Sequence, residues 1–92
     1  KPEKEYTLKA VIDIGSTSIR MVVAQIFSNG TYEALDSLKQ SVSIGSDTFT
    51  KGRINQSTID DCVKAMRNFA AVIQEYAISI DKNVRAVATS AA

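Results

Sequence analysis

Residues 12–20 read Ile-Asp-Ile-Gly-Ser-Thr-Ser-Ile-Arg, and this stretch decides the fold that we expect for the chain. An apolar run from Ala10 to Ile14 contains one acid, Asp13, and ends in one glycine and three hydroxyl residues. A second apolar run, Ile19 to Phe27, follows directly. Short apolar runs that are bounded by turn residues are typical of strands. The sequence therefore predicts two neighbouring strands joined by a tight turn at residues 15–18.

The chemistry of this turn is suited to a phosphate group. Gly15 allows a sharp bend and a close approach by a ligand. Backbone N–H groups and the hydroxyls of Ser16, Thr17 and Ser18 can donate hydrogen bonds to phosphoryl oxygens. Asp13 would repel a bare phosphate, so it is useful there only through a cation. Mg²⁺ fits this role because it binds one or two carboxylates, keeps several waters and bridges to phosphate.

An ordinary hairpin is the alternative interpretation of the same turn. Residues 13 and 20 would then face each other, and Asp13 would pair with Arg20. Such a cross-strand pair stabilises a sheet by roughly 0.2–1 kcal/mol. The two interpretations are compatible, and both stay open at this point.

Composition narrows the function classes. The chain has 92 residues, 45% of them hydrophobic, which is enough for one modest core and one domain. Its net charge of +1 gives no field that would favour nucleic acid or an anionic membrane, and we expect neither as a partner. No stretch reaches the ~20 apolar residues of a membrane span, and no signal peptide is visible, so we expect a cytoplasmic protein. The absence of histidine removes the commonest general base and zinc ligand.

The remaining pattern predicts a β-β-β-α-β order. A meander of three antiparallel strands is followed by a helix that crosses over and returns a last strand parallel to the first. Asn29-Gly30 predicts a two-residue hairpin turn with positive φ. The expected elements are a frayed tail over residues 1–6, strands over 7–14, 19–28 and 31–44, a loop over 45–54, a helix over 56–78 and a strand over 84–88. The third strand is the most polar, which suits the edge of a sheet.

The long helix has the clearest periodicity. Its apolar positions follow the three-then-four spacing of an amphipathic helix. Asn55 or Ser57 can cap it, and Ser57 with Asp60 matches a capping box. The positions expected to face the core are Ile59, Cys62, Val63, Met66, Phe69, Ala70, Ile73, Tyr76 and Ala77.

The predicted topology brings a second group of hydroxyls to the turn. If the last strand lies beside the first, Thr89 and Ser90 emerge at the same end of the sheet as Asp13. In open α/β sheets, ligands usually bind at the carboxyl ends of the strands. We therefore expect two hydroxyl-bearing turns to face one space.

These residues resemble a known family. The segment from Asp13 to Arg20 is similar to the first phosphate-binding loop of the actin, Hsp70 and sugar-kinase superfamily. The segments Val42–Gly45, Gly52–Ile54 and Val84–Ala91, with the helix between them, resemble the exopolyphosphatase and guanosine-pentaphosphate phosphohydrolase (Ppx/GppA) family. The resemblance covers nearly all of residues 8–92. It implies an α/β fold: part of a ribonuclease-H-like lobe with a mixed sheet, an antiparallel meander and one long helix.

The resemblance also implies a function. Such enzymes remove terminal phosphates from polyphosphate or guanosine pentaphosphate by Mg²⁺-assisted hydrolysis, with substrate between two lobes. Asp13 would lie at the metal, and Gly15, Ser16, Thr17 and Ser18 would form the phosphate loop. Arg20 would support that loop, while Thr89 and Ser90 would begin the segment lining the phosphate channel.

Two departures from the family pattern matter. The family usually has Asn at the position of Thr17, although a hydroxyl can still donate a hydrogen bond. The glutamate that serves as catalytic base and the second glycine-rich loop would lie beyond Ala92, so we assign no catalytic residue within the chain. We therefore expect these 92 residues alone to be inactive, with homodimer formation through exposed apolar surface left open.

Two other functions remain as alternatives. An actin-like assembly protein that binds ATP would use the same loop. A domain that senses a phosphorylated alarmone without cleaving it would do so as well. The family-like segments after Val42 and Val84 favour the phosphatase over both.

Overall fold

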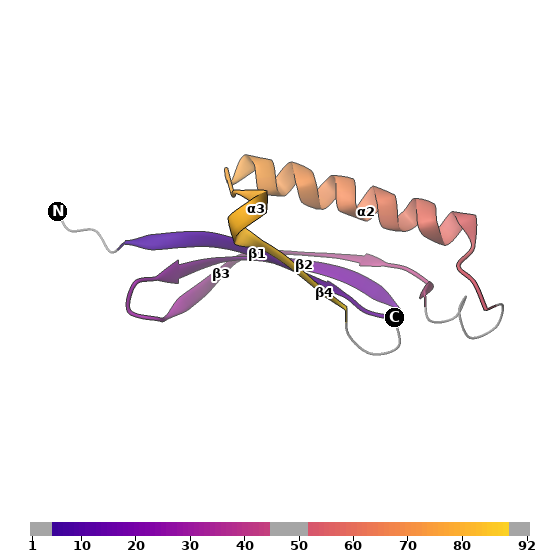
Figure 1. Ribbon diagram of the computed structural model, residues 1–92, viewed down its shortest axis with the longest axis horizontal. Helices are drawn as coiled ribbons and strands as arrows, with labels where there is room; N and C mark the ends of the chain where they lie inside the picture. The colour runs from indigo at the N-terminus through magenta and orange to yellow at the C-terminus, as the bar shows by residue number, and fades with distance from the viewer. Residues whose placement is uncertain (1–4, 45–51, 89–92) are drawn as a thin grey trace.

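The computed structural model describes residues 5–44 and 52–88, which form one mixed sheet with a long helix across one face (Figure 1). The sheet contains β1 (Tyr6–Ile14), β2 (Ser18–Phe27), β3 (Tyr32–Ser41) and β4 (Val84–Ala88) in the order β3-β2-β1-β4. Helices α2 (Gln56–Glu75) and α3 (Ile80–Asn83) lie between β3 and β4 in the chain. β1 and β2 are antiparallel, as are β2 and β3, whereas β4 is parallel to β1. The predicted meander and the parallel return of the last strand are confirmed.

The two central strands alternate between the two faces of the sheet. Ala10 and Ile12 of β1 and Ile19, Met21 and Val23 of β2 are buried on the face that α2 covers. The residues between them point to the opposite face because successive side chains of a strand alternate. β1 begins at Tyr6, one residue earlier than expected, and residues 1–4 of the predicted tail lie outside the described residues.

The hairpin between β2 and β3 differs from the predicted two-residue turn. The Phe27 amide donates to the Thr31 carbonyl at 2.8 Å, and the Gly30 amide donates to the Phe27 carbonyl at 2.9 Å, so the loop has three residues. Only Gly30, with φ +92°, takes the left-handed conformation that was expected for both Asn29 and Gly30. The Asn29 side chain instead accepts hydrogen bonds from the Thr31 amide and hydroxyl, at 3.0 and 2.7 Å. This local bonding favours a three-residue loop with a left-handed glycine.

β3 lies at the edge of the sheet, as its polarity predicted. The strand is shorter than the expected 31–44, since it ends at Ser41. A bulge opposite Val23 and Ala24 shifts its register by one residue. Leu38 therefore faces the core side, opposite Met21, although an unbroken register from the hairpin would have placed it on the other face.

Helix α2 starts where expected but is not capped as expected. Asn55 is the N-cap residue, and its side chain makes no capping hydrogen bond. Ser57 lies inside the helix, so the predicted capping box with Asp60 does not form. Asp60 instead accepts a hydrogen bond from the Gln56 side-chain amide at 2.9 Å.

The C-terminus of α2 comes three residues earlier than predicted. The helix ends at Glu75, and Ala77 has a φ of 57°. The Ala77 amide donates to the Gln74 carbonyl at 3.0 Å, and the Ile78 amide donates to the Ile73 carbonyl at 3.1 Å. These two bonds define a Schellman motif, in which glycine usually occupies the left-handed position. Without a glycine in the sequence there was no signal to stop the predicted helix.

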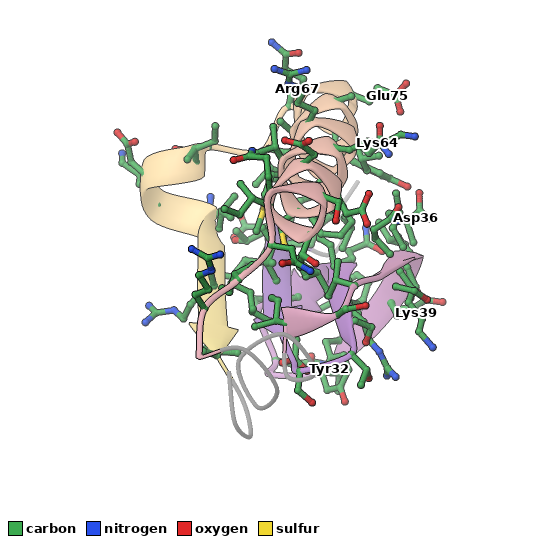
Figure 2. The ribbon with its side chains drawn as sticks, turned by 90° about the vertical axis from the view of Figure 1, so that its right-hand side faces the viewer. Tyr32, Asp36, Lys39, Lys64, Arg67 and Glu75 are labelled. Atoms are coloured by element: carbon green, nitrogen blue, oxygen red, sulfur yellow. The ribbon has the colours of Figure 1, made fainter. Side chains whose placement is uncertain are left out.

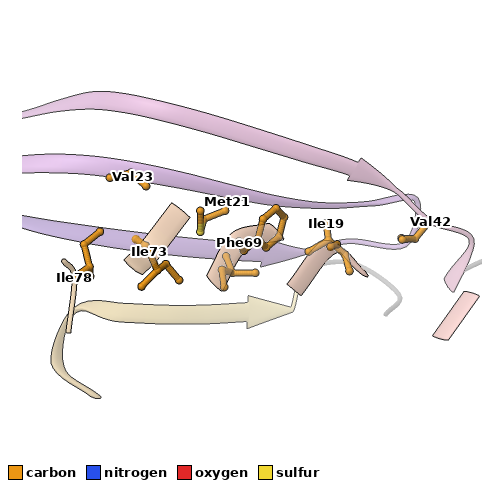
Figure 3. Packing of buried hydrophobic residues seen from close by; sticks show 10 residues of the cluster. Ile19, Met21, Val23, Val42, Phe69, Ile73 and Ile78 are labelled. Atoms are coloured by element: carbon orange, nitrogen blue, oxygen red, sulfur yellow. The ribbon is translucent and has the colours of Figure 1, made fainter. Parts of the chain in front are cut away.

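One flank of α2 packs against β2 to form the core. Figure 3 shows Phe69 and Ile73 of the helix against Ile19, Met21 and Val23 of the sheet. The buried positions of α2 are Thr58, Ala65, Phe69 and Ile73. The prediction that Ile59, Val63, Ala70 and Ala77 face the core is wrong. Ile59 and Val63 are 41% and 44% exposed, and the two alanines are exposed as well. The apolar face of α2 is wider than the part of the sheet that lies under the helix, so residues at the margin of this face stay exposed.

Between α2 and β4 the chain forms a short helix that the sequence analysis missed. α3 is a single turn of four residues, and the Asn83 amide donates to the Ser79 carbonyl at 2.8 Å. β4 then begins at Val84 and ends at Ala88, as predicted. Among the described residues, no helix combines the length and the hydropathy needed to cross a bilayer.

Candidate functional site

The predicted turn is present at the carboxyl end of β1. The Gly15 amide donates to the Ser18 carbonyl at 2.9 Å, and Ile14 opposite Ile19 is the last pair of the β1–β2 ladder. Gly15, Ser16 and Ser18 are half-buried, whereas Thr17 is exposed. The structure thus brings the four predicted phosphate-binding residues together in one short loop.

The chain after β3 holds this loop from a second side. The amide of Val42 donates to the carbonyl of Thr17 at 3.0 Å. Val42 and Ile19 belong to the buried core, at 7% and 1% exposure. The loop is therefore fixed to the sheet by a backbone bond and by core packing next to it, which leaves the Thr17 side chain at the surface.

Asp13 and Arg20 face each other across the two strands, as predicted. Both lie on the sheet face opposite α2, because Ile12, Ile14 and Ile19 point toward the helix side. Asp13 is half-buried and Arg20 is exposed. This register places one acid and one base directly beneath the loop.

The sequence analysis missed Lys39 of β3 as a neighbour of this pair. Lys39 lies opposite Arg20 in the β2–β3 ladder, so the two cations share the sheet face of Asp13. In Figure 2, Lys39 lies farther from α2 than Asp36 of the same strand. An unbroken register from the hairpin would have placed Leu38 opposite Arg20, and only the bulge moves Lys39 there. A bulge leaves no clear signal in a single sequence, so this neighbour was not predictable.

β4 reaches the same end of the sheet as the loop. Val87 pairs with Asp13 and Ala88 pairs with Ile14 in the parallel ladder. Ala88 is the last described residue, so the predicted hydroxyls of Thr89 and Ser90 lie outside the described residues. The structure confirms the strand placement on which that prediction depends, and the meeting of the two hydroxyl groups stays a prediction.

The residues at the loop suit a cation that is shared with a phosphate. Within residues 5–44 and 52–88, no three His, Cys, Asp or Glu side chains are grouped to hold a metal ion. A self-contained metal centre therefore has no ligand set in this part of the chain. Mg²⁺ that keeps its waters and bridges to phosphate needs only one or two protein carboxylates, and Asp13 beside the loop fits that requirement.

The side chains with clearly shifted pKa values in the described part of the chain lie near α2. Burial raises the pKa of the Cys62 thiol, and the Asp61 carboxylate raises it further. Desolvation also raises the pKa of the Tyr76 phenol, with a contribution from Asp36. The Tyr76 hydroxyl donates a hydrogen bond to Asp36 Oδ2 at 3.3 Å, which ties the end of α2 to β3. Both shifts keep a neutral side chain protonated, and neither group belongs to the loop.

Comparisons with known proteins identify relatives of this chain. A model of the Ppx/GppA phosphatase family matches residues 22–92, beginning just after the loop. A Haemophilus influenzae protein named "Putative exopolyphosphatase" is 35% identical over 80 residues, which are 87% of this chain and 24% of that protein. A Fusobacterium nucleatum "Bifunctional 3-dehydroquinate synthase/phosphatase" is 28% identical over 96 residues, which are 96% of this chain and 14% of that protein.

Solved structures show the same fold. The Aquifex aeolicus member of the Ppx/GppA protein family superposes with a TM-score of 0.80 and 27% identity, over 91% of this chain and 26% of that chain. An exopolyphosphatase from Cytophaga hutchinsonii gives a TM-score of 0.77 and 26% identity, with the same coverage of 91% and 26%. These neighbours share the actin-like ATPase fold, which confirms the predicted fold class. The 92 residues span about a quarter or less of each relative's length.

Proposed function

The chain belongs to the Ppx/GppA phosphatase family, and we propose that the protein containing it hydrolyses terminal phosphoanhydride bonds of inorganic polyphosphate or guanosine pentaphosphate. The family match and the name of the Haemophilus influenzae relative support a phosphatase of the polyphosphate type. The fold similarity to an exopolyphosphatase supports the same class of reaction.

The observation that carries the proposal is the loop at the end of β1. It presents a glycine and three hydroxyl residues at the edge where β1 and β4 both end, with Asp13 and Arg20 directly beneath. Backbone N–H groups and hydroxyls in such a loop can cradle a phosphoryl group. Positioning and charge stabilisation contribute most of the catalysis in phosphoryl transfer, so few acid–base groups are needed at this loop.

Each residue has a role in this proposal. Ser16, Thr17 and Ser18 bind and orient the terminal phosphate through hydroxyl and backbone donors. Arg20, with Lys39 beside it, offsets negative charge from Asp13 and from the phosphate. Asp13 would hold Mg²⁺, which when bound would neutralise charge on the phosphoryl oxygens. The general base is proposed to come from another part of the protein.

Phosphate release by the complete protein tests the proposal. Polyphosphate, guanosine pentaphosphate and ATP are compared with Mg²⁺ and again with EDTA. We expect release from one of the first two, lost with EDTA. Asp13→Asn should lower release at least about 100-fold, because metal charge stabilisation is worth several kcal/mol and each ~1.4 kcal/mol is tenfold.

Asp61→Asn is the matched control, because Asp61 is an exposed acid on α2. Its release rate should equal that of the unmodified protein. Release that persists in Asp13→Asn would contradict the proposed role of Asp13. Turnover or binding of ATP alone would favour an actin-like assembly protein, and binding of guanosine pentaphosphate without release would favour a sensor.

A further inference from the structure

The N-terminal half of β1 has a backbone edge that no described element covers. β2 pairs with β1 along its whole length, whereas β4 joins it only from Ala10 onward. Figure 1 shows β1 extending past the start of β4 toward the N-terminus. Within the described part of the chain, residues 5–9 therefore have a neighbouring strand on one side only. An exposed strand edge is a template for pairing with another strand.

The free hydrogen-bonding groups of this edge belong to Tyr6 and Leu8. The Ser28 amide donates to the Glu5 carbonyl at 3.1 Å, so the backbone groups of Glu5 point toward β2. Hydrogen-bonded and non-hydrogen-bonded pairs alternate along an antiparallel ladder. By this alternation Thr7 also points toward β2, whereas Tyr6 and Leu8 point their N–H and C=O groups outward.

These outward groups match those of a second copy of the same edge. In an antiparallel arrangement with a two-fold axis at Thr7, Tyr6 lies opposite the partner's Leu8, and Leu8 lies opposite the partner's Tyr6. Both pairs are of the hydrogen-bonded kind, so each outward N–H meets an outward C=O. A shift of one residue would place outward groups opposite groups that point toward β2, and a shift of two would pair Tyr6 or Leu8 with a position outside residues 5–9.

The charged side chains agree with the same register. Glu5 lies opposite the partner's Lys9, and Lys9 lies opposite the partner's Glu5, so two pairs of opposite charge form. A hollow of about 100 Å³ next to Lys9 is also lined by Lys82 and Arg85, and the described residues that line it include no acid. The partner's Glu5 would lie beside this basic hollow. Lysine on a strand edge usually opposes pairing with another strand, but here each lysine meets an acid.

The sheet face that carries α2 would gain apolar contacts in this arrangement. Tyr6 is 54% exposed, and its ring contacts Phe27 edge-on, with the ring centroids 6.3 Å apart. Leu8 packs at the margin of the core. Pairing places the Tyr6 ring over the partner's Leu8. The ladder is short, so we expect a weak dimer whose population depends on concentration.

We propose that this edge, residues 5–9 of β1, pairs with the same edge of a second copy of the protein to form a two-fold symmetric dimer. A two-fold interface uses the same patch on both subunits, and the charges of Glu5 and Lys9 are complementary to themselves in that way. The edge lies at the opposite end of β1 from Gly15, so the pairing does not involve the phosphate loop. The proposal is therefore independent of the hydrolase assignment, and its tests do not use activity.

Charge-reversal variants of the complete protein test the register by analytical ultracentrifugation. We expect the average mass of the unmodified protein to rise with concentration. Glu5→Lys and Lys9→Glu each place like charges together at both ends of the ladder, so each should raise the dimer Kd at least about tenfold. A mixture of the two variants should associate about as tightly as the unmodified protein, because every pair is again of opposite charge. Glu75→Lys and Lys64→Glu, at exposed positions of α2, are the matched controls and should leave Kd unchanged.

Cysteine crosslinking of the complete protein tests the position of the two-fold axis. Thr7→Cys places two thiols at the axis, with Cα atoms about 4.5 Å apart, which a disulfide can span. Lys9→Cys is the control on the same face of the strand, because its two copies lie four positions apart along the ladder, about 13 Å. In a background with Cys62→Ser and no other cysteine, Thr7→Cys should crosslink at least about tenfold faster than Lys9→Cys on mild oxidation. Equal crosslinking rates, a monomeric mass at every concentration, or a dimer that the charge reversals leave unchanged would each overturn the proposal.

Discussion

Replacing Ile19 by alanine tests whether the core holds the phosphate loop in place. Ile19 is 1% exposed, follows the loop directly and packs beneath α2 (Figure 3). The substitution removes three carbon atoms, worth about 2.4 kcal/mol at roughly 0.8 kcal/mol each. The cavity adds to this, so we expect a loss of about 3–4 kcal/mol in unfolding free energy, within the usual range for such changes.

Val22→Ala is the matched control on the same strand. Val22 lies on the face away from α2 and is 37% exposed. Two carbon atoms are removed from a partly solvated site, so the expected loss is about 1 kcal/mol. Folded chains of 92 residues have unfolding free energies of about 5–14 kcal/mol. The loss at Ile19 is therefore a large fraction of the total stability, whereas the loss at Val22 is a small one.

Urea unfolding followed by circular dichroism measures both losses. It should be done on the longest form of the protein that unfolds in a single transition. At a slope of roughly 1.5 kcal/mol per M, Ile19→Ala should lower the midpoint by about 2 M and Val22→Ala by about 0.7 M. If Val22→Ala lowers the free energy of unfolding as much as Ile19→Ala does, the wrong face of the sheet has been assigned to the core. The proposed anchoring of the loop by Ile19 would then be wrong as well.

Three further predictions follow from local geometry. Gly30→Ala should lower the free energy of unfolding by about 1 kcal/mol, and Ala77→Gly should raise it by about as much, because both positions have positive φ. Urea unfolding measures both changes. Changes of the same sign would contradict the assigned turn and helix end. Asp61→Asn should speed alkylation of Cys62 near neutral pH, because removing the negative charge lowers the raised pKa of the thiol and increases the thiolate fraction. Mass spectrometry over time measures the alkylation rate. An unchanged rate would show that Asp61 does not raise the pKa of the thiol. The 92-residue chain alone should release no phosphate from polyphosphate with Mg²⁺, and measurable Mg²⁺-dependent release would mean that the general base lies within it.

Most strand positions were predictable because they depend on local pattern. The apolar runs around Asp13 and Gly15, and the short run from Val84 to Ala88, each have the composition of a strand bounded by turn residues. Their boundaries agree with the structure to within one residue. The loop of hydroxyl residues was predictable for the same reason, since its ends are defined by the runs on either side.

Helix ends and turn types were less predictable because they depend on single backbone conformations. Ala77 takes a left-handed conformation without the glycine that usually marks it, so the predicted helix continued too far. At Asn29-Gly30, hydrogen bonds from Thr31 to the Asn29 side chain accompany a three-residue loop in place of the expected two-residue turn. The same residues are compatible with several backbone conformations, and local hydrogen bonds stabilise one of them.

The sequence by itself determined the order of the strands along the chain and the long helix, because these follow from hydrophobic periodicity over neighbouring residues. It also offered the placement of Asp13 opposite Arg20 as one interpretation, because a turn over residues 15–18 sets that register. The tertiary structure alone decided which residues share a face across the sheet. The β3 bulge brings Lys39 beside Arg20, and the position of α2 over β2 and β3 leaves Ile59 and Val63 exposed. Both outcomes depend on how elements far apart in the chain fit together, since burial is set by the width of the partner surface and not by the apolar pattern of one element.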